Sequence, residues 1–335
     1  MSARKSLAIT AVVAVTALGL AACGSGGSGD ENTSTGGTTS SGGTETTAAG
    51  GADTGTLTVW QNNTTGNGPA FWQTVVDGFK KVQPGVTLTI VPVQNEDLDG
   101  KLQTALNGGD APDVFLQRGG GKLADMVNAG FVADITDAID APDIPEGAFL
   151  GDSLDGKIFA MPMTILPGGL FYSKDLFAQA GITTPPTTLD EFNVAVSKLK
   201  AAGITPIALG GKDAWPAAHW YYWFALRECS ADAIDKASAS QDLSDPCFLK
   251  AGQDLQTFAG TQPFNSDFLT TSAQQGASSS AGLVANHKAA MELMGAWDPG
   301  VIGSLTPDQK NLPDLGFFPF PSVPGGQGDP SAMMG

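Results

Sequence analysis

The sequence predicts an α/β protein of two lobes, because segments with the pattern of strands are followed repeatedly by segments with helical spacing. The first such unit begins at about residue 55, and a second group of units begins near residue 158. A chain of 335 residues is long enough for two lobes of ordinary size. We therefore expect a first lobe over residues 55–162 and a second lobe over residues 163–318.

Strand and helix patterns alternate three times in the first lobe. The predicted strands span residues 57–60, 86–93 and 113–116, and the predicted helices span residues 71–82, 97–106 and 122–129. Pro84 and Gly85 end the first helix, and glycines end the other two. Strands joined by helices favour a doubly wound lobe with a mostly parallel sheet.

The second half of the chain repeats this pattern with longer helices. Strands are predicted at residues 158–161, 170–172, 206–209 and 291–294, and helices at residues 189–202, 215–227 and 248–258. Thr188 and Glu191 form a capping-box pattern at the start of the first of these helices, and Gly203 ends it. We expect a second α/β lobe.

The first 22 residues have the three parts of a secretory signal peptide. Arg4 and Lys5 precede an apolar run over residues 7–20, and small residues follow it. The run is too short for a comfortable transmembrane span, which requires roughly 20 apolar residues. The ending Leu20-Ala21-Ala22-Cys23 resembles a bacterial lipoprotein signal, although an ordinary signal peptide ending near a cysteine is the alternative.

The lipoprotein resemblance implies that Cys23 is lipidated and becomes the N-terminus of the mature chain. Residues 23–54 consist almost entirely of small and polar residues, which cannot bury enough surface to offset the entropy of ordering. We expect a disordered tether there. The protein is therefore expected at the extracellular face of the cell membrane, attached to it through the N-terminal lipid alone.

Charge and cysteine content exclude some functions. The chain has 17 basic and 34 acidic residues and a net charge of −17, which argues against a nucleic-acid partner.

Cys229 and Cys247 are expected to form a disulfide in an oxidising compartment.

The motifs of common enzymes are missing from the sequence. Neither His219 nor His287 lies in H-E-x-x-H, and neither G-x-S-x-G nor a complete phosphate-binding loop motif occurs. We therefore predict no enzyme activity, no cofactor and no metal. Paired carboxylates for glycoside hydrolysis are not excluded by spacing, so a secreted glycoside hydrolase remains an alternative.

Polar side chains gather where the predicted strands of the first lobe end, which is where α/β sheets bind ligands. Their amide, guanidinium and carboxylate groups suit hydrogen bonds to neighbouring hydroxyls. The candidates in this lobe are Gln61, Asn62, Asn63, Glu96, Gln117 and Arg118.

Tryptophans in the predicted second lobe offer flat apolar rings of the kind on which sugar rings stack, so a sugar is the first candidate ligand. Trp215 lies in a predicted loop, and Trp297 follows a predicted strand at its carboxyl end. Trp220 is a third candidate on the helix that follows Trp215, although its neighbours Trp223 and Phe224 are more simply explained as core residues.

A phosphorylated ligand is the rival to a sugar. Gln117 and Arg118 precede three glycines and a predicted helix, and a glycine-rich helix start with a nearby arginine can bind phosphate. A sugar phosphate or a glycerol phosphodiester would use this feature.

Five segments in the same order resemble the family 1 extracellular solute-binding proteins, the maltose-binding-protein-like receptors of ABC importers. They are the G-x-x-P-D-V turn at residues 109–114, I-F-A-M-P at 158–162, F-Y-S-K-D-L-F at 171–177 with Ser173 in place of the usual Asn, the G-I…P-P-x-T-x-D-E-F segment at 181–192, and K-A-A-M…G-x-W at 288–297.

The resemblance implies a two-lobed periplasmic-binding-protein-like fold with a hinge between the lobes. It implies a carbohydrate ligand, most simply an oligosaccharide, held in the interlobe cleft with a stacking tryptophan at Trp297. It also implies delivery to ABC transporter permease subunits by a monomeric receptor. In the family the chain returns to the first lobe after its second crossover, so we expect residues 319–335 to form that crossover and the later C-terminal part to be missing.

Overall fold

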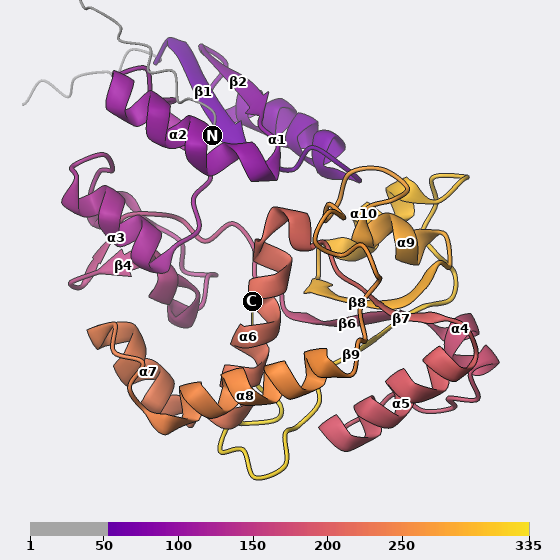
Figure 1. Ribbon diagram of the computed structural model, residues 1–335. Helices are drawn as coiled ribbons and strands as arrows, with labels where there is room; N and C mark the ends of the chain where they lie inside the picture. The colour runs from indigo at the N-terminus through magenta and orange to yellow at the C-terminus, as the bar shows by residue number, and fades with distance from the viewer. Residues whose placement is uncertain (1–52, 335) are drawn as a thin grey trace, which may run out of the picture. The chain divides into compact units, whose positions relative to one another are not determined.

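The computed structural model describes residues 53–334, which contain a three-stranded sheet, a four-stranded sheet and a small two-stranded sheet (Figure 1). The expected signal peptide, Cys23 and nearly all of the expected tether lie outside the described residues. The two larger sheets come from the parts of the chain that the sequence assigns to the first and second lobes.

The first sheet is parallel throughout, as the sequence predicts. Its strand order is β2-β1-β3, and β1 pairs in parallel with both neighbours. The strands are β1 (Gly55–Gln61), β2 (Val86–Pro92) and β3 (Val114–Phe115), and the helices are α1 (Gly68–Val82), α2 (Asn95–Gly108) and α3 (Gly120–Asn128). Each predicted strand and helix of this region is confirmed, with its ends shifted by a few residues.

A side-chain contact ties the start of β3 to β1. The backbone N–H and the hydroxyl of Thr58 both donate to Oδ2 of Asp113, at 2.7 and 2.8 Å. These bonds lower the pKa of Asp113, with the Thr58 N–H making the largest contribution. Asp113 therefore holds the turn that follows α2, and Gly109 ends α2 with a left-handed φ of 77°.

The prediction of a strand over residues 158–161 is mostly wrong. Only Ile158 of that range is in a strand, because β5 (Lys157–Ile158) pairs with β4 (Ser153–Leu154) in a short antiparallel hairpin. Two short 3₁₀ helices precede the hairpin, at Thr136–Ala138 and Glu146–Asp152.

The second sheet is mixed, unlike the parallel first sheet. Its order is β7-β8-β6-β9, in which β7 and β8 are parallel while β6 runs antiparallel to both β8 and β9. The strands are β6 (Gly168–Ser173), β7 (Thr205–Ala208), β8 (Ala289–Gly295) and β9 (Leu315–Phe318). Strand β9 is not among the predicted elements.

Helices cover both faces of the second sheet (Figure 1). They are α4 (Lys174–Gln179), α5 (Leu189–Ala201), α6 (Trp215–Glu228), α7 (Ala231–Ser240), α8 (Pro246–Gly260), α9 (Ser280–Ala285) and α10 (Asp298–Leu305). Leu170 and Tyr172 of β6 point to the core under α5, α6 and α8, whereas Phe171 points to the core under α9 and α10. The capping box of Thr188 and Glu191 is confirmed at the start of α5.

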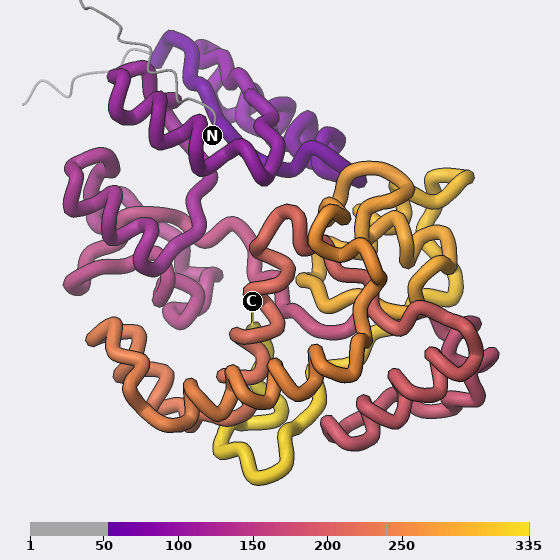
Figure 2. The backbone as a smooth tube through the Cα atoms, viewed as in Figure 1, coloured from indigo at the N-terminus to yellow at the C-terminus, as the bar shows by residue number. Residues whose placement is uncertain are grey.

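The C-terminal segment packs against α6, on the core under α5, α6 and α8, and the crossover expected over residues 319–335 stays a prediction. The buried guanidinium of Arg227 in α6 donates to the carbonyl oxygens of Phe320, Asp329 and Ala332, at 2.9–3.2 Å. The amide of Gly168 also donates to the carbonyl of Met334, at 2.6 Å. The chain end accordingly lies beside α6 (Figure 2). Local sequence patterns carry no signal for such a distant arginine contact.

Cys229 and Cys247 form the disulfide expected from the sequence. The bridge joins the residue after α6 to the first turn of α8 and encloses α7. It therefore connects two of the helices that cover one face of the second sheet.

Two carboxyl groups are buried next to one another on the side of the second sheet that α9 and α10 cover. Glu292 lies in β8 and Asp298 begins α10, with 1% and 0% of their surfaces exposed. All four carboxyl oxygens lack a hydrogen-bond partner among the described residues. Burial raises the pKa of Asp298 to about 8, and burial together with the charge of Asp298 raises the pKa of Glu292 well above its ordinary value.

Removing the disulfide should destabilise the protein. A Cys229→Ser/Cys247→Ser variant is expected to lose about 3 kcal/mol of unfolding free energy, because the unfolded chain is no longer restricted by the closed loop. Urea unfolding with and without a reductant measures this loss. The reductant should lower the stability of the wild type to that of the variant and leave the variant unchanged. Equal stability of variant and oxidised wild type would contradict the prediction.

The buried carboxyl pair should make the protein less stable as pH rises. Both folded-state pKa values are raised, so the folded state binds more protons than the unfolded state between about pH 5 and about pH 8. The unfolding free energy should fall across this window by up to about 1.4 kcal/mol per pH unit for each proton released.

Urea titrations at pH 5, 6, 7 and 8 measure this slope. A Glu292→Gln/Asp298→Asn variant should flatten it, because neutral amides of similar shape do not titrate. Asp190→Asn, which removes an exposed carboxylate from α5, is the matched control and should keep the wild-type slope. Identical slopes in all three proteins would refute a role for the buried pair.

Candidate functional site

Trp215 and Trp297 form an aromatic pair at the carboxyl end of β8. Trp215 is the first residue of α6, and Trp297 precedes α10. Their ring centroids lie 6.3 Å apart with the ring planes tilted by 56°. Both side chains are half-buried against the core that contains Phe171 and Met294, which leaves part of each indole exposed.

The Trp297 ring rests directly on Gly295. A Cβ atom at this glycine would lie 1.8 Å from the indole of Trp297, which no real contact permits. The G-x-W spacing at the end of β8 therefore has a steric cause, since only glycine leaves room for the ring. Trp215 follows Ala214, whose φ of 62° turns the chain sharply into α6, and the Nε1 of Trp215 is buried with no acceptor among the described residues.

Trp220 is a core residue, so its predicted role as a sugar platform is wrong. Its side chain is 1% exposed and stacks on Phe258 and Phe192, with centroids at 5.3 and 6.4 Å. Five residues of α-helix turn the chain by about 500°, which directs Trp220 to a different face from Trp215. Trp223 is likewise buried in the core, as expected.

Asn95 connects three of the polar residues predicted in the first lobe. Its Oδ1 accepts hydrogen bonds from Asn62 Nδ2 at 2.9 Å and from Arg118 Nη2 at 2.8 Å. Its Nδ2 donates to Glu96 Oε1 at 3.2 Å. The Oε2 of Glu96 also accepts a bond from Gln275 Nε2 at 3.2 Å. Asn95 is not among the residues predicted from the sequence, although its position after β2, at a strand carboxyl end, was the available signal.

The two glutamines of the predicted site hold turns. Gln61 is only 2% exposed, and its Oε1 accepts the backbone N–H of Asn63, so its predicted contact with a ligand is wrong. Gln117 is half-buried, and its Oε1 accepts the N–H of Gly119. Each glutamine side chain closes the backbone turn that follows its strand, which explains why a glutamine lies at the end of both strands. Asn63 itself is half-buried beside this turn.

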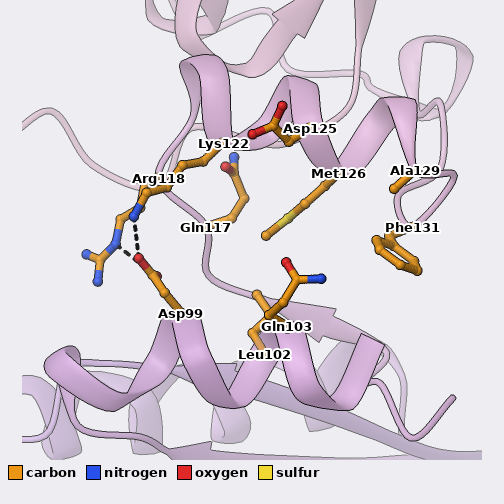
Figure 3. A pocket seen from close by; sticks show the side chains of 10 residues that line it. All are labelled: Asp99, Leu102, Gln103, Gln117, Arg118, Lys122, Asp125, Met126, Ala129 and Phe131. Carbon is orange, nitrogen blue, oxygen red and sulfur yellow. Dashed lines mark hydrogen bonds and ion pairs between the residues drawn. The ribbon is translucent and has the colours of Figure 1, made fainter. Parts of the chain in front are cut away.

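The cations near the glycine turn are already paired. Arg118 lies 3.5 Å from Asp99, and Lys122 also contacts this carboxylate. Burial tends to raise the pKa of Asp99, but hydrogen bonds and charges from Lys122 and Arg118 lower it below the ordinary value. These residues line a hollow of 400 Å³ between α2 and α3, whose far side carries Met126 and Phe131 (Figure 3). An anion at this place would have to displace Asp99.

The chemistry of the site suits binding better than bond cleavage. The aromatic pair offers apolar ring faces, and the Asn95 group offers planar amides and a guanidinium. Glu292 and Asp298 lie close to Trp297 in sequence, but both are fully buried and cannot reach a glycosidic bond.

Within residues 53–334, no helix is both long enough and apolar enough to cross a membrane.

Comparison with known proteins finds the family. Residues 61–335, well over half of the chain, match the family model for bacterial extracellular solute-binding proteins. The chain is 25% identical over 259 residues to a multiple sugar-binding protein of Streptococcus mutans, covering 76% of this chain and 60% of the relative. It is 26% identical over 275 residues to a diacetylchitobiose-binding protein of Streptomyces coelicolor, covering 79% of this chain and 60% of the relative.

Solved structures show the same fold. One comes from work on xylan utilization by the thermophilic bacterium Caldanaerobius polysaccharolyticus, with a TM-score of 0.76, 28% identity, and 83% of this chain and 71% of that chain covered. Another is a chitin oligosaccharide binding protein, with a TM-score of 0.69, 26% identity, and coverage of 83% and 69%. The chain spans three-fifths of the length of the two curated relatives named above. It belongs to the family of bacterial extracellular solute-binding proteins.

Proposed function

We propose that the protein is the extracellular receptor of an ABC importer and binds a carbohydrate, most simply an oligosaccharide. The observation that carries this proposal is the half-buried pair of Trp215 and Trp297 at the carboxyl end of β8. Sugar rings present apolar faces that stack on indoles and hydroxyl edges that need hydrogen bonds. The buried N–H of Trp215 lacks an acceptor in the described part of the chain, and a sugar hydroxyl could supply one after a small movement of the ring.

The first lobe supplies the polar edge in this proposal. Asn95 holds the side chains of Asn62 and Arg118 together, so these groups are oriented before a ligand arrives. Binding would select a closed arrangement of the two lobes through a hinge motion, and the permease subunits would recognise that form. Lipidation of Cys23 would keep the receptor at the outer face of the membrane, where it would act as a monomer.

The names of the relatives support a sugar as the ligand. A multiple sugar-binding protein and a diacetylchitobiose-binding protein match about three-quarters of this chain. A phosphorylated solute is less well supported, because both cations of the glycine turn are paired with Asp99. The hydrolase alternative is less well supported too, because the carboxyl pair next to Trp297 is buried.

Isothermal titration calorimetry tests the proposal. The chain without its signal peptide would be titrated with xylo-, malto-, cello- and chito-oligosaccharides, with raffinose and with glycerol phosphate. We expect micromolar binding of one sugar class. Release of reducing ends from the polysaccharides, measured in parallel, would favour the hydrolase, and heat from none of the sugars would contradict the receptor.

Replacing Trp297 should weaken sugar binding. Trp297→Ala removes a stacking surface and should raise the dissociation constant by about 30-fold, equivalent to roughly 2 kcal/mol. Trp297→Phe should recover much of the affinity, because an aromatic face remains. Trp72→Ala, a substitution on α1, is the matched control and should bind like the wild type. An unchanged dissociation constant for a folded Trp297→Ala protein would remove Trp297 from the site.

Glycerol phosphate should produce no binding heat with the wild type, because Asp99 is paired with both cations that would bind it. Asp99→Asn releases Arg118 and Lys122 and should create measurable phosphate binding, which serves as a positive control. Calorimetry on both proteins measures the difference. Tight phosphate binding by the wild type that Arg118→Gln abolishes would overturn the sugar proposal in favour of a phosphorylated solute.

A further inference from the structure

Three metal-ligating side chains meet at one end of the second sheet, although they are far apart in sequence. Asp175 lies in the first turn of α4, His287 lies between α9 and β8, and Asp314 directly precedes β9. The possible ligand atoms of the three residues all lie within 4.8 Å of one another. Asp175 and His287 are exposed and Asp314 is half-buried, so an ion could reach all three from solvent.

The strand register explains why these residues meet. Tyr172 of β6 pairs with Met291 of β8, and Ser173 pairs with Leu315 of β9. The carboxyl end of β6 therefore lies beside the amino ends of β8 and β9. Trp297 lies at the other end of β8, beyond the pair of Gly168 and Gly295. Six residues of strand separate the two ends, a distance of about 20 Å, so the cluster is separate from the candidate sugar site.

The distances in the cluster suit a small metal ion. The Nε2 atom of His287 lies 3.1 Å from each carboxylate oxygen of Asp314. Zinc binds imidazole nitrogen and carboxylate oxygen at about 2.0–2.2 Å, which places neighbouring ligand atoms of a tetrahedral site about 3.3 Å apart. A hydrogen bond between His287 and Asp314 alone would also give 3.1 Å, but it does not account for the second carboxylate at Asp175. Asp175 places a second carboxylate beside this pair, within the same 4.8 Å.

Contacts from neighbouring residues orient the ligands. The Ser173 hydroxyl donates to Oδ2 of Asp314, and the backbone N–H of Asp175 also donates to this oxygen at 3.4 Å. Outer contacts of this kind fix the direction of ligating carboxylates in metal sites. His287 has a left-handed φ of 52°, a conformation that a histidine adopts at a cost and that a glycine would adopt freely.

We propose that Asp175, His287 and Asp314 bind a divalent transition-metal ion of the zinc class, with water completing the coordination. One imidazole and two carboxylates are suitable ligands for Zn²⁺, whereas Ca²⁺ and Mg²⁺ prefer sites made of oxygen alone. The bound ion links the start of α4 with the segments that lead into β8 and β9. It stabilises the sheet at the end opposite to Trp297. This site does not depend on the proposed sugar-binding function.

Calorimetry tests the proposal. The chain without its signal peptide would be stripped of metal with EDTA and titrated with zinc chloride. We expect one ion per chain with a dissociation constant of about 10 μM or lower. Saturating zinc should raise the melting temperature by about 2 °C or more, because the ion binds the folded state alone. Calcium and magnesium chloride should produce neither effect at the same concentration. Sugar titrations with and without zinc should give the same affinity, so the two proposals can fail separately.

Variants locate the ion. His287→Gly removes the imidazole and relieves the left-handed backbone, so the metal-free protein should fold while zinc affinity falls at least about tenfold. Asp175→Asn should weaken zinc binding to a similar extent from an exposed position. The matched control Asp190→Asn removes a first-turn carboxylate from α5 and should bind zinc like the wild type. Cobalt, added as a spectroscopic probe, should give visible absorption bands that His287→Gly abolishes.

Two results would overturn the proposal. The first is the absence of zinc binding to the folded wild type. The second is equal zinc affinity in the wild type, His287→Gly and Asp175→Asn, which would place the ion among other acidic groups of the chain.

Discussion

The central strand β8 is the constraint on which the rest of the second lobe depends. All of its residues, Ala289–Gly295, are buried, because β7 and β6 flank it and helices cover both of its faces. A strand buried in this way has one possible register, since a slip of one residue would exchange its two faces. The positions of Trp297 at its carboxyl end and His287 before its amino end follow from that register. The candidate sugar platform and the candidate metal site are therefore opposite ends of one rigid element.

The same strand carries a feature that opposes stability. Glu292 lies in its middle and, with Asp298, places two carboxyl groups in the core where their charged forms are strongly disfavoured. Packing of the surrounding apolar residues must outweigh this cost. Asp298 directly follows Trp297 and begins α10, so the backbone joins the buried pair to the aromatic site.

Much of the fold followed from local patterns. The parallel first sheet and the capped helix α5 could be predicted because hydrophobic periodicity, capping residues and glycine stops act over a few neighbouring residues. The disulfide could be predicted because Cys229 and Cys247 are the two cysteines of the chain besides Cys23. The direction of β6, the existence of β9 and the contacts of Arg227 with residues 320–332 could not, because they depend on partners more than 90 residues away. Trp220 illustrates the same difficulty, since helical spacing cannot say which face of α6 meets the core.

The sequence by itself determined the family, the order of its α/β units and two aromatic residues of the candidate site, because each is written in short motifs with strong local preferences. Tertiary structure alone decided which polar groups meet. Asn95 joins Asn62 and Arg118 across three strand ends, and His287 meets Asp175 and Asp314 across three others. The physical reason is that strand pairing sets these distances through backbone hydrogen bonds, to which the side chains that become neighbours contribute nothing.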